Sequence, residues 1–168
     1  FESVARSLVE RGVKGPVALV GTNLIPVKYY RELEAIAPDI EWVPADDLVR
    51  SVRRIKSKRE LDCYRVAGET ATAGMTILME SLISGMSERE AAGEAAREVV
   101  RRGGRIQMIG TNHGDTLGFD QRFPLTGYSA DVPAIGAIVT GTLHGPLFQG
   151  YYLDPCRTAV RGKANSQQ

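Results

Sequence analysis

Two segments of the chain begin with the same Ser-x-x-Glu pattern, and this is the strongest local constraint on the fold. The pattern occurs at Ser57–Glu60 and again at Ser87–Glu90. In such a capping box, the Ser hydroxyl and the Glu carboxylate satisfy backbone N–H groups at the start of a helix. Apolar residues follow each pattern three or four positions apart, and Gly85 and Gly103 stand where the two patterns end. We therefore predict two consecutive amphipathic helices.

Helical periodicity disappears beyond Arg105. Short apolar runs alternate with Gly and Pro as far as Gly162, which is typical of a β meander. No charged residue occurs between positions 132 and 153, but six Gly and Pro residues interrupt this stretch, so it does not predict a membrane-spanning helix. We expect an α+β fold here, in which two helices precede an antiparallel β meander.

The first 45 residues carry a different pattern, in which helices and strands alternate. Apolar spacing predicts a helix from Glu2 to Arg11, and an apolar run at 17–21 predicts a strand buried on both faces. A second helix is expected from Pro26 to Ile36 and a second strand at 40–43. This is the order of an α/β layer, but two strands make too small a sheet to stand alone. We expect residues 1–52 to be the end of a domain whose beginning is absent.

The charge balance argues against binding to a polyanion. The chain has 21 Lys and Arg against 20 Asp and Glu, whereas nucleic-acid and anionic-membrane binders carry a basic excess. Six of the ten residues at 50–59 are basic, but no aromatic residue lies among them and acidic residues flank them. We interpret this stretch as a solvated domain junction rather than a nucleic-acid surface. Neither nucleic acid nor a membrane is expected as a partner.

The two cysteines, Cys63 and Cys156, belong to no Cys-x-x-Cys pair. Reduced thiols in a cytoplasmic protein are the favoured interpretation, and a disulfide is the alternative.

The chain has two histidines, His113 and His144. His113 and Asp115 form a His-x-Asp pair that could supply two metal ligands from a loop. An ordinary turn explains the Asn, Gly and Asp residues around them equally well and is favoured. His144 lies in an apolar hairpin and is expected to be structural. Gly-rich phosphate-binding loops and a Gly-x-Ser-x-Gly nucleophile motif are absent from the sequence.

The most informative segment is Gly-Tyr-Tyr-Leu-Asp-Pro-Cys-Arg-Thr at 150–158, followed by Gly162. Arg-x-Lys-Ser-x-x-Glu at 54–60 and Gly-x-Ser-Glu at 85–88 precede it. In this order the motifs resemble the pita-bread metallohydrolase family, which includes Xaa-Pro dipeptidase, aminopeptidase P, methionine aminopeptidase and the metal-free creatinase. The resemblance implies that residues 1–52 are the C-terminal part of a creatinase-type N-terminal domain. Residues 53–168 would then be the first half of the pita-bread catalytic domain.

The resemblance also implies a reaction. In the family, two divalent ions, commonly manganese, cobalt or zinc, activate a water for attack on an amide of a small peptide substrate. The metal ligands are Asp, Asp, His, Glu and Glu in chain order. Asp154 matches the second Asp, and Thr158 would face the same pocket because side chains alternate along a strand. The resemblance further implies a hydrolase, which we expect to be a homodimer.

Two departures from the family pattern affect this expectation. The position of the first Asp is occupied by Leu143-His144-Gly145, and no Asp or Glu occurs between positions 132 and 153. The remaining ligands would lie beyond Gln168. We therefore expect the chain as given to bind no metal pair tightly and to lack peptidase activity.

Three interpretations of these departures stay open. The intact protein could be a metal-free hydrolase in which His113 transfers the proton. It could be a non-catalytic relative that keeps the fold for binding or dimerisation. Leu143 could also be an isolated change, in which case Leu143→Asp in the full-length protein would restore metal binding.

Overall fold

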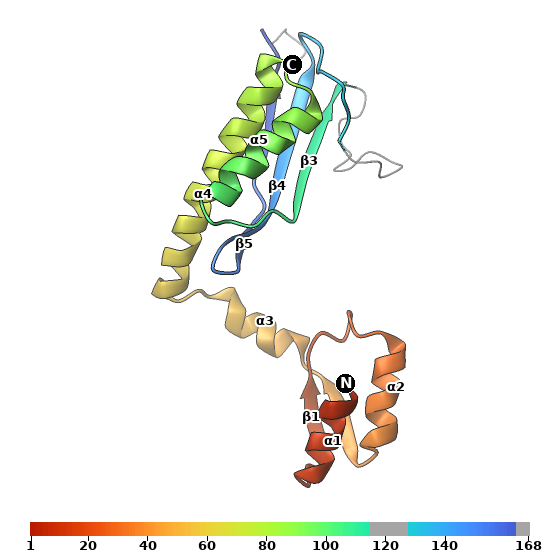
Figure 1. Cartoon of the computed structure of the whole chain (residues 1–168). Helices are drawn as coiled ribbons and strands as arrows, with labels where there is room; N and C mark the ends of the chain where they lie inside the picture. Colours follow the sequence, from red (N-terminus) through yellow and green to blue (C-terminus); the bar gives the residue numbers. More distant parts are fainter. Residues whose placement is uncertain (115–127, 164–168) are drawn as a thin grey trace. The chain divides into compact units, whose positions relative to one another are not determined.

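The computed structural model describes residues 1–114 and 128–163, and the chain divides into two compact units. The first unit is Phe1–Lys56 and the second is Ser57–Gln168. The division therefore follows Lys56, whereas the sequence placed it after residue 52. That the first unit belongs to a creatinase-type N-terminal domain stays a prediction. Figure 1 labels the elements of both units.

The first unit has helices around a two-stranded sheet. In chain order its elements are α1 (Glu2–Glu10), β1 (Gly15–Leu19), α2 (Val27–Ile36), β2 (Ile40–Pro44) and α3 (Asp46–Arg54). The two strands pair in parallel, and Ala5, Leu33, Ala37 and Ile40 form a small core. Strand β1 was expected to be buried on both faces, but its residues alternate between half-buried and exposed. Two strands and a few short helices offer too few neighbours to cover both faces.

Helix α3 occupies the segment that was interpreted as a solvated junction. None of its residues is buried, so the segment is solvated but helical. Its acidic first turn and basic last turn match the helix dipole, and this stabilises a helix that lacks a buried face. Asp46 accepts hydrogen bonds from the Thr22 hydroxyl at 2.6 Å and the Gly21 N–H at 2.7 Å, which lower the pKa of its carboxyl.

The second unit opens with the two predicted helices. Helix α4 spans Lys58–Ser84, helix α5 spans Glu88–Arg101, and each begins with its capping box. Gly85 ends α4 in the left-handed conformation, with φ of 104°. The helices approach each other closely at Gly74, where a Cβ atom would overlap the Val99 side chain. The prediction of two consecutive helices is confirmed.

An antiparallel sheet follows in the described part of the second unit. Its strands are β3 (Met108–His113), β4 (Ile138–Phe148), β5 (Tyr151–Leu153) and β6 (Cys156–Val160). Strand β4 pairs with β3 along one edge and with β5 and β6 along the other. Gln149 and Gly150, both with positive φ, form the turn between β4 and β5, and the register shifts between Pro146 and Phe148. The strands thus follow one another in antiparallel order, as expected for a meander.

His113 ends strand β3, and Gly114 follows it with a positive φ of 56°. Residues 110–113 lie in β3, because pairing with β4 overrides the local preference of Asn and Gly for turns. Asp115, the other member of the expected His-x-Asp pair, lies outside the described residues.

The two faces of the sheet differ. The odd-numbered residues of β4 from Val139 to Leu147 are buried, and the hydrophobic ones pack with α4 and α5. Figure 1 shows both helices on the same side of the strands. The even-numbered residues from Ile138 to Pro146 are half-buried and alternate onto the opposite side, which we call the far face. Ile109 of β3 and Ala159 of β6 also pack into the helix-side core, so the alternation extends across the sheet.

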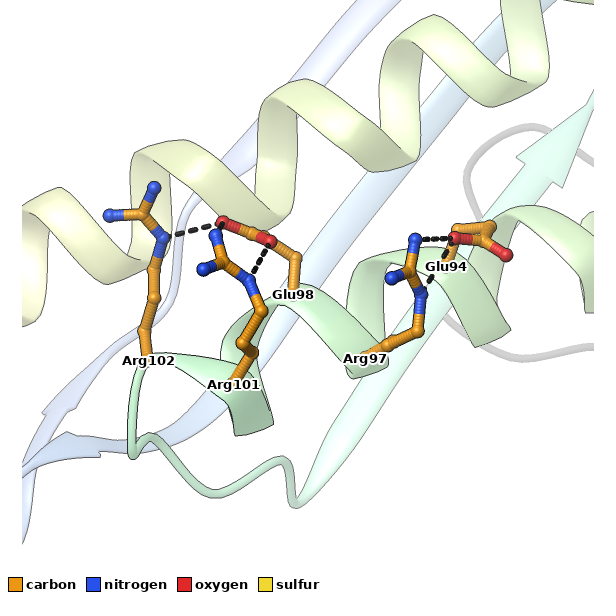
Figure 2. A network of polar contacts seen from close by, with 5 residues as sticks. All are labelled: Glu94, Arg97, Glu98, Arg101 and Arg102. Atoms are coloured by element: carbon orange, nitrogen blue, oxygen red, sulfur yellow. Dashed lines mark hydrogen bonds and ion pairs between the residues drawn. The ribbon is translucent and has the colours of Figure 1, made fainter.

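Helix α5 carries a row of ion pairs (Figure 2). Arg97 pairs with Glu94 at 2.6 Å, while Arg101 and Arg102 both reach Glu98, at 2.8 and 2.6 Å. Hydrogen bonds from Arg101 and Arg102 lower the pKa of Glu98 to about 2. These pairs stabilise the helix modestly, because water screens charges that lie near the surface.

Candidate functional site

Strands β5 and β6 run along β4 as one strand, although regular structure is interrupted at Asp154 and Pro155. Leu153 pairs with Gly145 before the interruption and Cys156 pairs with Thr142 after it, in the same register. The Leu143 N–H donates a hydrogen bond of 3.1 Å to the Pro155 carbonyl, so the two backbones stay in contact. Continuing this register across the interruption sets Asp154 opposite His144.

Three rows of residues therefore cross the far face. Directly opposite residues in antiparallel strands place their side chains on the same face, so each row can be followed from β3 through β4 to the third strand. The rows are Asn112, Thr140 and Thr158; Gly110, Thr142 and Cys156; and Met108, His144 and Asp154. Hydroxyl, amide, thiol, imidazole and carboxylate groups thus share one surface. Thr158 lies on the same face as Asp154, as the alternation predicted.

The groups around Asp154 have few partners. Asp154 is exposed, and within the described chain its carboxylate forms no ion pair or hydrogen bond. The half-buried ring of His144 lies 5.3 Å from the ring of Tyr152, centroid to centroid. The Cys156 thiol lies 3.4 Å from the Thr142 hydroxyl. A carboxylate, an imidazole and a thiol are therefore available on neighbouring positions of two strands.

Asn112 adds an unsatisfied acceptor to the far face. The residue is 4% exposed, and its Oδ1 atom has no hydrogen-bond partner among the described residues. A buried amide oxygen without a donor is costly, by about 1–3 kcal/mol. This position can therefore accept a hydrogen bond from a bound molecule or water.

Leu143 lies on the other side of the sheet. Its side chain is fully buried, and a Cβ atom on Gly74 of α4 would overlap its Cδ1. The position that the family pattern gives to the first Asp thus belongs to the helix-side core. The β4 residues that share a face with Asp154 are Thr142 and His144 instead.

A comparison with known families gives this geometry a context. The sequence profile of metallopeptidase family M24 matches residues 62–168, which is more than half of the chain. The chain belongs to metallopeptidase family M24. The resemblance inferred from the sequence motifs is therefore confirmed.

Relatives of this M24 chain are peptidases by name. The chain is 27% identical over 161 residues to an Xaa-Pro dipeptidase of Pyrococcus horikoshii, a match that covers 94% of this chain and 44% of that protein. It is 30% identical over 152 residues to a probable dipeptidase PepE of Mycobacterium bovis, covering 90% and 39%. The chain thus spans less than half the length of these relatives.

Solved structures support the same fold. The prolidase of Pyrococcus horikoshii superimposes with a TM-score of 0.76 at 24% identity, covering 99% of this chain and 46% of that one. The mixed helix and strand fold of the M24 chain therefore matches part of the prolidase fold. Within the described residues, none of its helices has the length and apolar character needed to span a membrane.

His113 of the M24 chain does not share the far face with Asp154. Its Nε2 lies 3.5 Å from Oε1 of Glu88, the first residue of α5, and the Ser129 hydroxyl donates to Glu88 Oε2 at 2.9 Å. Glu88 is 1% exposed. Glu88 belongs to the Gly-x-Ser-Glu motif at 85–88, but its contact with His113 was not expected from the sequence. A proton-transfer role for His113 stays a prediction.

The described residues of the M24 chain do not fit a carboxylate-bridged metal pair. The family consists of metallopeptidases that generally use divalent metals, and two hard ions need several oxygen ligands. No group of three or more His, Cys, Asp or Glu side chains within residues 1–114 and 128–163 could hold a metal ion. Asp154 as one metal ligand stays a prediction.

Proposed function

We propose that the chain is one part of an M24 hydrolase of the Xaa-Pro peptidase type, and that its far face forms one wall of the site for a small peptide substrate. The position of Asp154 carries this proposal. It is an exposed carboxylate at the family position, beside Thr142, Cys156 and Thr158 on the same surface. A peptide offers both hydrogen-bond donors and hydrogen-bond acceptors, and the hydroxyl and amide groups of this face can bond to both.

We further propose that these 168 residues alone bind no metal pair tightly and do not hydrolyse peptides. Of the five ligands implied by the family pattern, the chain offers Asp154, while Leu143 lies in the core. One carboxylate cannot replace the hydration shells of two manganese, cobalt or zinc ions. The other ligands would have to come from outside these residues.

Calorimetric titration and a peptidase assay test the proposal together. Manganese chloride titrated into the chain is expected to give no stoichiometric, submicromolar binding. The dipeptide Ala-Pro is expected to stay intact in the presence of manganese, cobalt or zinc. Tight binding of two manganese ions per chain, or metal-dependent release of proline, would contradict the proposal.

A metal-free relative that acts as a binding or dimerisation module is the second candidate. The observation that favours it is that β4 contains no Asp or Glu. The positions of β4 that face the same way as Asp154 include Thr142 and His144, and neither carries a carboxylate. In the metal-free hydrolase that the sequence leaves open, His113 would transfer the proton. A longer form of the protein that binds Ala-Pro without metal and without hydrolysis would favour the binding module.

The assembly and location of the protein belong to the same proposal. We propose a homodimer, because the described residues leave sheet edges uncovered and such edges favour association. We propose the cytoplasm as its location, because Cys63 and Cys156 are both unpaired.

A further inference from the structure

We propose that a pocket of the first unit, between α2 and β2, binds a small organic cation of the substituted ammonium class (Figure 1). The pocket has a volume of about 400 Å³, which is within the range of small-molecule sites in proteins. Residues of α2, of the turn after it and of β2 form its walls. The inference goes beyond the proposed function, because the pocket belongs to a different unit from the far face and requires no peptidase activity.

The local fold explains how the pocket arises. Tyr30 and Glu34 are four positions apart in α2, so they lie on the same face of that helix. Ile40 and Trp42 share one face of β2, while Glu41 between them points to the other face. All three of these β2 residues line the pocket. The pocket therefore follows the outer edge of β2, which is the edge that does not pair with β1.

The charge of the walls favours a cation. Glu34 and Glu41 are both exposed, and no Lys or Arg among the described residues lines the pocket. Glu34 accepts a hydrogen bond from the Tyr30 hydroxyl, which raises the pKa of the phenol. Glu41 has no ion pair within residues 1–114 and 128–163. Two carboxylates without a basic neighbour on the walls attract a positive charge and repel an anion.

The aromatic side chains select an organic cation over a metal ion. Tyr30 and Trp42 place a phenol ring and an indole ring on the walls, and aromatic rings attract cations, the indole most strongly. A metal ion such as calcium needs six or more oxygen ligands, whereas these walls offer two carboxylates. The alkyl groups of a substituted ammonium ion can instead pack against the rings and Ile40 while its charge faces the carboxylates.

The indole N–H of Trp42 adds a preference for a ligand that carries an oxygen atom. Its Nε1 atom is buried and has no hydrogen-bond acceptor among the described residues. A buried donor without an acceptor is unfavourable, and an oxygen atom of the ligand would supply one. Choline combines a quaternary ammonium group with a hydroxyl group, so it is the probe that matches these walls.

Titration of the 168-residue chain with choline chloride tests the pocket. Trp42 is the only tryptophan of the sequence, so the proton–nitrogen NMR spectrum contains one indole signal, which reports directly on this pocket. Choline is expected to shift that signal with one site per chain. The expected dissociation constant is millimolar, because water screens carboxylates that lie near the surface. The neutral analogue, in which a carbon atom replaces the choline nitrogen, should bind at least about fivefold more weakly.

Two variants test the carboxylates. Glu34→Gln and Glu41→Gln each remove one charge and keep the size of the side chain, so each should weaken choline binding by about threefold or more. Glu10→Gln is the matched control, because Glu10 is exposed at the end of α1 and does not line the pocket. Its affinity for choline should equal that of the parent chain.

Four outcomes would overturn the proposal. They are no shift of the Trp42 signal at about 50 mM choline, the same shift with sodium chloride, equal affinity for the neutral analogue, and an equal loss of affinity in Glu10→Gln. None of these readouts depends on peptidase activity or on added metal, so the proposed function can fail or succeed separately.

Discussion

At the scale of single residues, Thr142 and Leu143 are adjacent in sequence but face opposite sides of the sheet. Leu143→Asp replaces a fully buried side chain with a carboxylate. We expect it to lower the free energy of unfolding by about 4 kcal/mol or more, from lost packing and an unpaired buried charge, and to restore no metal binding. Thr142→Asp is expected to cost less than about 1 kcal/mol, because its side chain lies on the far face.

Urea denaturation followed by circular dichroism measures both variants. Thr142→Asp should also strengthen manganese binding in calorimetry, since it adds a second carboxylate beside Asp154. A stably folded Leu143→Asp chain that binds manganese would show that the face assigned to Leu143 is wrong.

At the scale of elements, the end of α4 depends on Gly85. A Cβ atom there would overlap the guanidinium of Arg161, which donates a hydrogen bond to the Pro133 carbonyl. Gly85 also has a positive φ, which costs an alanine about 1–2 kcal/mol. We expect Gly85→Ala to lower the free energy of unfolding by at least that amount.

Gly93→Ala is the matched control within the next helix. Gly93 lies exposed in α5, and a Cβ atom there meets nothing within 4 Å. This variant is expected to raise the free energy of unfolding by about 0.5–1 kcal/mol. Urea denaturation measures both variants. A Gly85→Ala variant that is more stable than the parent chain would contradict the account of the α4 end.

The helices of the second unit could be predicted because their signals are local. The two capping boxes mark where α4 and α5 begin, and Gly85 marks where α4 ends. These boundaries therefore follow from short stretches of sequence. Helix α3 was missed because the basic run at 50–59 was interpreted as a junction, although Leu48, Val49 and Val52 recur at helical spacing and leave an apolar face that is not buried. The face of Leu143 could not be predicted from Asp154, because the register shift between Pro146 and Phe148 changes the alternation between the two strands.

At the scale of the whole molecule, the edge of β6 that faces away from β4 pairs with no other strand among the described residues, and this favours association. The Leu143 N–H donates to the Pro155 carbonyl, and the Arg161 N–H donates to the Ala137 carbonyl. Between these two bonds, the backbone N–H groups of β6 point alternately toward β4 and away from it. The Thr158 N–H then points away from β4 and is available to another strand. We expect the chain to sediment as a dimer or larger species, and a monodisperse monomer would count against this.

Thr158→Pro tests whether the β6 edge is responsible. Proline removes the outward N–H but leaves the hydrogen bonds to β4 intact, so the far-ultraviolet spectrum should not change. Sedimentation equilibrium should show a larger monomer fraction at the same concentration. An unchanged association constant would show that the interface does not include the β6 edge.

The alternation along β4 also has a consequence for how such a protein can diverge. Side chains at odd positions of β4 fill the space against α4 and α5, so substitutions there are constrained by side-chain volume. Substitutions at even positions change the polar groups of the far face without disturbing that packing. Loss or gain of a ligand on this strand is therefore a single step that leaves foldability unchanged. A descendant could exchange one chemistry for another on the far face while its core stays the same.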